Sequence, residues 1–244
     1  MHLDIQLLPV KPSQESLHGR SVVVIDVLRA TSVMVQAFSQ GLEELFPVPT
    51  VEEALELRER FGFETTLLGG ERGGKQIEGF HFGNSPREYT ADRVKGRRLI
   101  MTTTNGTKAF HSVTGGAEIL VGSFFNALAV ADRVLSSGRD LLIYPSGNYG
   151  KFSLEDTVCG GLLIDLIMVR EPKERGTIDL SDAAFSARVL YQRFEKNLLD
   201  AFYLSSHGRY LASIGLEEDL PYCAQRNITD VVPVFKDGMI RAQK

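Results

Sequence analysis

Short apolar runs alternate with segments of helical periodicity along most of the chain, and this alternation constrains the fold more than any other feature. It is typical of βαβ units, in which helices connect the strands of an α/β sheet. Val22–Ile25 is apolar at every position, which suits a central strand. The pattern predicts strands near His2–Leu8, Ser21–Asp26, Glu44–Val48, Thr65–Leu68, Arg98–Thr102, Glu118–Gly122, Asp140–Tyr144 and Val231–Phe235.

Helix signals lie between these strands. Thr50–Glu53 is a capping box that opens a helix ending before residue 62, and Ser153–Asp156 resembles one that opens a helix to about residue 170. Asp182–Phe202 is the longest helical pattern, with Ser181 as its cap. The Asp-Gly pair inside Phe235–Ile240 predicts a hairpin near the end of the sequence.

Composition excludes several classes of protein. The chain has 244 residues, of which 43% are hydrophobic and 24% charged, and its formal net charge is −4. No basic run suggests nucleic acid or a membrane surface, and Met1–Ile5 does not open a signal peptide. Cys159 and Cys223 do not form a disulfide framework, so we expect reduced thiols and a cytoplasmic protein. We expect one domain over residues 1–244, with a subdomain joint considered only near 171–180.

A run of hydroxyls leaves one predicted strand just before a helix. Thr102, Thr103 and Thr104 precede Asn105, and a helix is expected over Thr107–Val113. Open α/β sheets bind ligands at the carboxyl ends of their strands, where helix N-termini favour anions. The alternative is structural, since threonine suits strands and asparagine caps helices.

Asp26 ends the most apolar predicted strand and is followed closely by Arg29 and Thr31. A carboxylate at that place can ligate Mg²⁺ or act as a nucleophile, and an arginine beside it can bind an anion in a bidentate manner. The alternative is that Asp26 caps the helix beginning near Arg29. The local sequence does not separate the two interpretations.

A second strand end carries the glycine-rich stretch Gly69–Lys75, with Glu71 and Arg72 inside it. Glycines let the backbone approach a charged ligand, so we expect a ligand-binding loop. The stretch partly matches a nucleotide phosphate-binding loop, but Gln76 stands where serine or threonine should hold Mg²⁺. Nucleotide binding is therefore kept as the alternative function.

Two further groups of polar residues lie near predicted strand ends. Asn84 and Ser85 precede Pro86, which predicts an N-cap and also provides an anion contact. Glu155 and Asp156 open a predicted helix, where the helix dipole favours acids; they are either surface acids or metal ligands.

Familiar phosphatase chemistries can be tested against these spacings. Neither cysteine has an arginine six residues on, an Asp-x-Asp motif fails at Leu28, and the five histidines form no close pair. What remains is a divalent metal held by carboxylates, which orients a phosphate and activates water or an aspartate.

Four sequence blocks resemble the signature blocks of the 2-phosphosulfolactate phosphatases, in order and spacing. They are Ile25–Thr31, Leu68–Arg72, Ile77–Phe80 with Gly83–Pro86, and Met101–Thr107. The similarity extends from about Ser21 to Val232. It implies a three-layer α/β/α fold around a mostly parallel or mixed sheet. It also implies a Mg²⁺-dependent phosphatase that converts 2-phospho-3-sulfolactate to 3-sulfolactate on a route to coenzyme M.

We accordingly assign roles to the residues in these blocks. Expected catalytic residues are Asp26, Arg29 and Glu71, and expected metal ligands are Asp26, Glu71, Glu155 and Asp156. Expected contacts to the anionic phosphorylated and sulfonated substrate are Arg29, Thr31, Arg72, Asn84, Ser85, Thr103, Thr104 and Asn105. A nucleotide-dependent enzyme and a non-catalytic sensor of an anionic metabolite are the rival functions, and a homo-oligomer is an open expectation.

Overall fold

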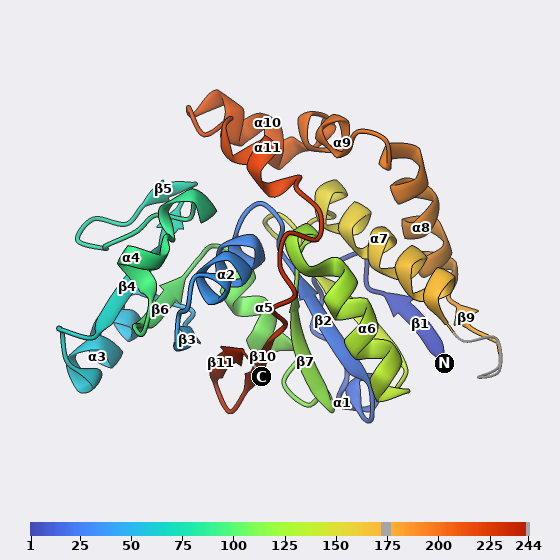
Figure 1. The fold of residues 1–244 in the computed structure, drawn as a ribbon, viewed down its shortest axis with the longest axis horizontal. Helices are drawn as coiled ribbons and strands as arrows, with labels where there is room; N and C mark the ends of the chain where they lie inside the picture. Colours follow the sequence, from blue (N-terminus) through green and yellow to red (C-terminus); the bar gives the residue numbers. More distant parts are fainter. Residues whose placement is uncertain (172–176, 243–244) are drawn as a thin grey trace.

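The computed structural model describes residues 1–171 and 177–242, and within these residues eleven strands form one mixed sheet (Figure 1). The sheet order is β5 (Lys75–Gln76), β4 (Thr66–Arg72), β6 (Arg98–Thr102), β3 (Glu44–Pro47), β11 (Met239–Ala242), β10 (Pro233–Lys236), β7 (Glu118–Gly122), β2 (Ser21–Ile25), β8 (Leu141–Pro145), β1 (His2–Ile5) and β9 (Asp179–Leu180).

The sheet consists of two parallel groups joined by an antiparallel hairpin. Strands β4, β6 and β3 run parallel to one another, and so do β7, β2, β8, β1 and β9. The hairpin β10–β11 lies between the groups and pairs antiparallel with β7 and β3. Asp237 and Gly238 both have positive φ, 51° and 80°, which is the conformation of a tight hairpin turn. The predicted hairpin is therefore confirmed, and it gives the sheet its mixed character.

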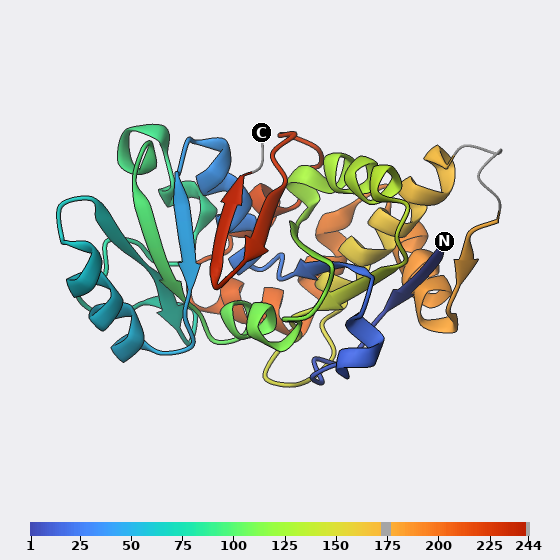
Figure 2. The ribbon, with the colours of Figure 1, turned by 90° about the horizontal axis from the view of Figure 1, so that it is seen from below.

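Helices cover both faces of the sheet. One face carries α6 (Ala127–Ser137), α7 (Leu154–Arg170) and α8 (Asp182–Phe194), and the other carries α2 (Ala30–Ser39) and α5 (Gly106–Ser112). Figure 2 shows α6 and α5 on opposite sides of the sheet. Helix α3 (Val51–Phe61) covers β4 and β6. The remaining helices are α1 (Gln14–Leu17), α4 (Ala91–Val94), α9 (Leu198–Leu204), α10 (Ser206–Ser213) and α11 (Asp219–Cys223), with 3₁₀ turns at Pro86–Glu88 and Phe124–Asn126.

The central strand shows why an all-apolar run is needed. Val23 and Ile25 pack with the α6–α7 side, whereas Val22 and Val24 pack with the α2–α5 side. Alternate residues of a strand point to opposite faces, so a strand covered on both sides has no solvent-facing position. The expected three-layer α/β/α class is confirmed.

Local helix signals succeed at the caps and fail at the extent of one helix. Thr50 and Ser153 accept hydrogen bonds from the third residue of their helices, as predicted. The helix predicted over Asp182–Phe202 is wrong as one unit, because α8 ends at Phe194 and α9 begins at Leu198. Between them the Asn197 side chain donates to Asp200 (2.8 Å), a local contact that favours a helix start over continuation.

The predicted ligand-binding loop at Gly69–Lys75 is instead the end of β4, a Gly73–Gly74 turn and the start of β5. Gly70 has a φ of 145°, and a Cβ there would lie 2.0 Å from the carbonyl oxygen of Thr102. The close approach that this glycine permits is therefore between β4 and β6. No helix follows the stretch, so the nucleotide alternative loses the geometry it requires.

The single-domain interpretation stays a prediction, and much of the considered joint, residues 172–176, lies outside the described residues. In the described part of the chain, no helix has both the length and the apolar character needed to span a membrane.

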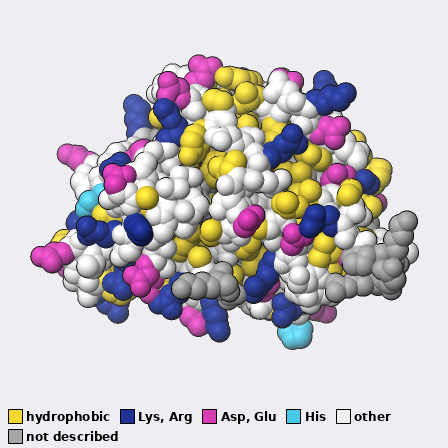
Figure 3. All heavy atoms as spheres, viewed as in Figure 1, with side chains coloured by type: hydrophobic (Ala, Val, Ile, Leu, Met, Phe, Trp, Pro, Cys, Tyr) yellow, Lys and Arg dark blue, Asp and Glu magenta, His cyan; other side chains and the backbone are white. Residues whose placement is uncertain are grey.

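Figure 3 shows apolar side chains gathered on one face where α10 and α11 lie in Figure 1. Tyr203, Leu204 and Tyr210 of α9 and α10 are among the exposed apolar residues. The homo-oligomer expectation remains open.

Candidate active site

Asp26 lies directly after β2, where the two strand groups converge. Its Oδ1 accepts from the Ala30 N–H (3.2 Å), and its own N–H donates to Thr31 Oγ1 (2.9 Å). A Cβ at Gly106 would lie 2.5 Å from Asp26 Oδ2, so the first residue of α5 contacts the carboxylate with no room for a side chain. By accepting from the Asp26 N–H, the Thr31 hydroxyl stabilises the turn between β2 and α2.

Glu71 lies near the end of β4, and its side chain bonds to the backbone just after β6. Its Oε1 accepts from the Thr104 N–H (2.8 Å) and its Oε2 from the Gly74 N–H (2.7 Å). The side chain is buried. Two backbone donors hold the carboxylate in one orientation, which is the way a protein fixes a functional acid.

Asp26 and Glu71 line the same small cavity, which we call the inner cavity. Its volume is about 20 Å³, enough for one water-sized group. Its other polar lining residues come from all sides of the site and are Arg29, Asn84, Thr103, Thr104, Asn105, Tyr149, His207 and Tyr210. Asn84 Oδ1 is buried there without a hydrogen-bond partner. A buried acceptor left unpaired points to a missing ligand.

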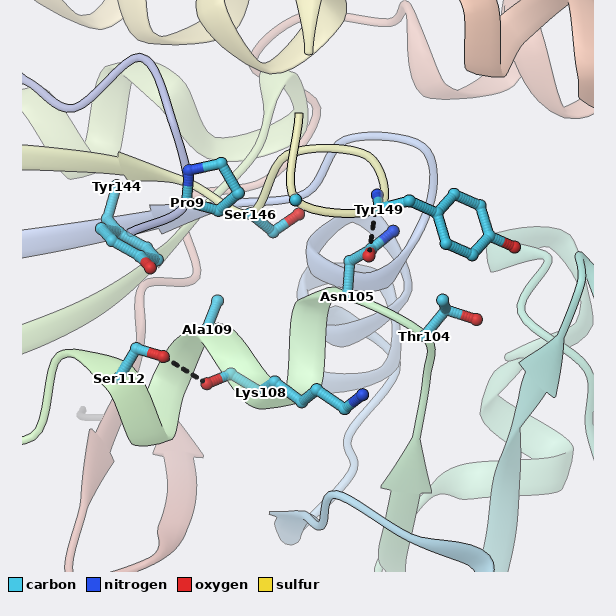
Figure 4. A pocket seen from close by; sticks show the side chains of 10 residues that line it. Pro9, Thr104, Asn105, Lys108, Ala109, Ser112, Tyr144, Ser146 and Tyr149 are labelled. Carbon is cyan, nitrogen blue, oxygen red and sulfur yellow. Dashed lines mark hydrogen bonds between the residues drawn. The ribbon is translucent and has the colours of Figure 1, made fainter. Parts of the chain in front are cut away.

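A larger pocket adjoins the inner cavity, and we call it the outer pocket (Figure 4). Its volume is about 480 Å³, and Thr104, Asn105 and Tyr149 line both spaces. Figure 4 shows α5 with Lys108 on one wall and Pro9, Tyr144 and Ser146 on the opposite wall. The two spaces together can accept a small molecule with one group in the inner cavity.

Burial raises the pKa of Asp26 from 3.8 to about 6. The Ser146 hydroxyl and the Ala30 N–H oppose this rise in pKa, and the nearby charge of Glu71 adds to it. A carboxylate in this situation is stabilised either by a proton or by a cation.

Glu155 and Asp156 open α7 and are buried, contrary to a surface role. Burial raises the pKa of both, that of Asp156 well above its ordinary value, with Asp26 contributing to each rise. Asp156 Oδ1 accepts from the Val27 N–H (2.9 Å), next to Asp26 in the chain. Neither acid is among the residues that line the inner cavity.

The four expected metal ligands therefore fall into two pairs. Asp26 and Glu71 share a cavity, and Glu155 with Asp156 lies beside the backbone that follows Asp26. Among the described residues, no three His, Cys, Asp or Glu side chains are grouped so as to hold a metal ion. A cation in the inner cavity would need oxygen ligands of other kinds as well.

Arg29 is buried in an ion pair. Its Nη1 donates to Asp219 Oδ2 (2.6 Å) and its Nη2 to the Gly74 carbonyl oxygen (2.8 Å). Ser85 Oγ donates to the other oxygen of Asp219 (2.6 Å), so Ser85 takes the predicted N-cap position before Pro86 but its side chain makes no capping hydrogen bond. Asp219 thus connects two expected substrate contacts, and the motif analysis did not give it a role.

Of the remaining expected substrate contacts, Thr103 and Asn105 line the inner cavity and Arg72 does not. Arg72 Nη2 donates to Thr102 Oγ1 (2.9 Å), and Arg72 does not line the inner cavity. Thr103 Oγ1 accepts from the Thr107 N–H (3.1 Å), so Thr103 caps α5 as well as lining the cavity. Asn105 makes no capping bond, and its Oδ1 accepts from the Tyr149 N–H (3.3 Å).

His207 is the clearest omission of the sequence analysis. It comes from α10 and lines the inner cavity together with Asp26 and Glu71. Burial and then the Arg29 charge lower its pKa, so the imidazole is neutral near neutral pH. Its neighbours Ser206 and Gly208 form no recognisable motif. Only the packing of α10 over the strand ends brings it there.

Comparison with known proteins agrees with this arrangement. Residues 7–238 match the family described as 2-phosphosulpholactate phosphatase. A Clostridium acetobutylicum protein named "Probable 2-phosphosulfolactate phosphatase" is 40% identical over 240 residues, covering 98% of this chain and 100% of that protein. A protein of the same name from Symbiobacterium thermophilum is 39% identical, covering 94% of this chain and 97% of its own length.

The fold, the paired carboxylates and these matches define the class as an α/β phosphoric monoester hydrolase. The chain belongs to the 2-phosphosulpholactate phosphatase family. The resemblance inferred from the four sequence blocks is confirmed, and the match extends beyond the Ser21–Val232 range at both ends.

Proposed function

We propose that this protein hydrolyses 2-phospho-3-sulfolactate to 3-sulfolactate and inorganic phosphate. The observation that carries the proposal is the juxtaposition of Asp26 and Glu71 at one cavity that adjoins a pocket large enough for the substrate. Phosphoryl transfer needs positioning and neutralisation of charge more than covalent chemistry by the protein. Family membership supports the choice of substrate.

We further propose that the reaction requires Mg²⁺, held by Asp26 and Glu71 with help from Asn84. Mg²⁺ prefers oxygen ligands and is commonly bound by one or two carboxylates, with water and substrate phosphate completing its shell. The unpaired Asn84 Oδ1 and the raised pKa of Asp26 fit such an occupant. When bound, the ion would neutralise phosphate charge during transfer.

The protein's own residues then divide into two groups. Asn84, Thr103, Thr104 and Asn105 line the cavity and would contact the phosphate. Arg29, Thr31, Arg72 and Ser85 act mainly as positioning residues, because their polar groups bond to Asp219, Asp26, Glu71 and Thr102. Asp26 would serve as a metal ligand, with the nucleophile as the alternative role, and Glu155 and Asp156 lie beside the backbone that follows it.

The reaction would take place in the cytoplasm, on the route to coenzyme M that the sequence resemblance implies. Cys159 and Cys223 are both buried and unpaired, which suits a reducing compartment. The overall net charge of −4 leaves anion binding to local groups at the site.

Phosphate release from a panel of phosphorylated hydroxy acids tests the proposal. We expect 2-phospho-3-sulfolactate to be the best substrate and 2-phospholactate, which lacks the sulfonate, to react more poorly. Equal efficiency on the two compounds would contradict the substrate assignment. A sensor would bind without releasing phosphate, and a nucleotide-dependent enzyme would bind ATP in equilibrium measurements.

A further inference from the structure

The outer pocket carries a single charge. Among the described residues that line it, Lys108 is the only charged one, and the others include the hydroxyls of Thr104, Ser112 and Ser146. The inner cavity, in contrast, is lined by Asp26, Glu71 and Arg29. Because Arg29 is ion-paired with Asp219, the two carboxylates give the inner cavity a charge opposite in sign to that of Lys108.

Lys108 makes no ion pair with any residue in the described ranges. Its side chain extends from α5 toward the wall where Thr104 and Asn105 lie (Figure 4). Ala109 and Ser112 are the other α5 residues on this wall, and the Lys108 side chain is exposed, so its ammonium group is accessible to a ligand. Lys108 lines the outer pocket, and an unpaired cation at that place is suited to an anionic group of a bound ligand.

We propose that Lys108 binds the sulfonate of the substrate in the outer pocket and thereby determines specificity. The inference rests on the proposed function. The inner cavity has room for one water-sized group, so the phosphate is placed where it meets the outer pocket, beside Thr104 and Asn105, and the carbon that carries the sulfonate then lies in the outer pocket. The sulfonate then comes within the space that Lys108 faces.

The position of the group decides which anion Lys108 meets. Among the described residues that line the outer pocket, Lys108 is the charged one, and its ammonium group carries three donors on a flexible stem. The sulfonate is the charged group that distinguishes 2-phospho-3-sulfolactate from 2-phospholactate, so this cation can discriminate between the two compounds. Asn105 adds a donor, because its Oδ1 accepts from Tyr149 and its Nδ2 is then available to the ligand.

Steady-state kinetics of Lys108→Met on three substrates test the proposal. These are 2-phospho-3-sulfolactate, 2-phospholactate and 2-phosphoglycerate, which share the phosphate and carboxylate and differ in the group on the third carbon. Losing one charge-assisted contact should lower kcat/KM about tenfold to thirtyfold on the sulfonated substrate, mainly through KM. The other two substrates should change less than about twofold. Lys108→Arg should recover part of the loss.

The matched control is Lys196→Met, because Lys196 is exposed between α8 and α9 and lines neither space. Melting temperatures of all variants establish that they fold. An equal loss on the three substrates, or no loss on any, would overturn the assignment of Lys108 to the sulfonate.

Calorimetric binding of 3-sulfolactate and of lactate, in the presence of Mg²⁺, separates this inference from the proposed function. We expect the wild type to prefer 3-sulfolactate and Lys108→Met to lose that preference. If the wild type released no phosphate from any compound, the proposed function would fail, and the binding preference would still decide the role of Lys108. An unchanged preference in the variant would reject it.

Discussion

Two pairs of buried acids lie near the end of β2, and all four were expected to ligate a metal, with Asp26 and Glu71 expected to be catalytic as well. Asp26 and Glu71 face the inner cavity, whereas Glu155 and Asp156 do not line it. Burial raises the pKa of Asp26, Glu155 and Asp156 alike. Burial and a raised pKa are therefore common to Asp26, Glu155 and Asp156, and access to the inner cavity is the feature that separates Asp26 from the other two.

The largest effect should come from Asp26→Asn. The substitution keeps size and shape but removes the charge that a metal ligand or a nucleophile needs. We expect turnover of 2-phospho-3-sulfolactate to fall at least about a hundredfold. If Asp26 only capped α2, asparagine would cap equally well and turnover would stay near the wild-type value.

Stability gives the same variant a second readout. The pKa of Asp26 is about 6 when folded and 3.8 ordinarily, so the folded state holds this proton more tightly. This tighter binding of the Asp26 proton stabilises the folded state by on the order of 2–3 kcal/mol. The stabilisation is fully present below pH 3.8 and is lost as the pH rises through about 6. Without divalent cations, Asp26→Asn should therefore have a melting temperature at pH 7.5 equal to or above that of the wild type. A clear drop would mean that the charged form stabilises the fold.

Glu71→Gln should have the next largest effect. Glutamine has one carbonyl oxygen for two backbone donors, Thr104 and Gly74, so one donor would face an amide NH₂. We expect a loss of about 1–3 kcal/mol in the free energy of unfolding and at least about tenfold in turnover. Glu78→Gln, at an exposed position of the same segment, is the control and should change neither. Wild-type turnover in Glu71→Gln would remove Glu71 from the metal site.

The smallest effect should come from Asp156→Asn. Burial raises the pKa of Asp156 well above its ordinary value, so a neutral amide removes a charge that the buried site disfavours. Asparagine also keeps the oxygen that accepts from Val27. Turnover should stay within about threefold of the wild type, with an unchanged or higher melting temperature. A hundredfold loss of turnover would place Asp156 among the metal ligands and remove the distinction between the pairs.

The sequence predicted the fold well where a signal is local. The apolar run at Val22–Ile25, the caps at Thr50 and Ser153 and the turn at Asp237–Gly238 each depend on neighbouring residues, and each is confirmed. The break between α8 and α9 was missed because it depends on one asparagine contact within an otherwise helical pattern.

The site was harder to predict because its contacts are distant in sequence. From the sequence, Arg29 and Ser85 were expected to bind an anionic substrate. Only the structure shows that both side chains already donate hydrogen bonds to Asp219. His207 and the open space around Lys108 likewise depend on how α10, α5 and the strand ends pack together. Motifs located the ends of β2 and β6 correctly and placed the end of β4 too early, and they could not show which groups are already bonded.

The central claim is that Asp26 and Glu71 hold a divalent cation on which phosphate release depends. The most direct test is the initial rate of phosphate release from 2-phospho-3-sulfolactate by the wild type, after exhaustive chelation and then across a titration with Mg²⁺. The account predicts a rate near zero after chelation and a saturable recovery with Mg²⁺. Full turnover after chelation would contradict it.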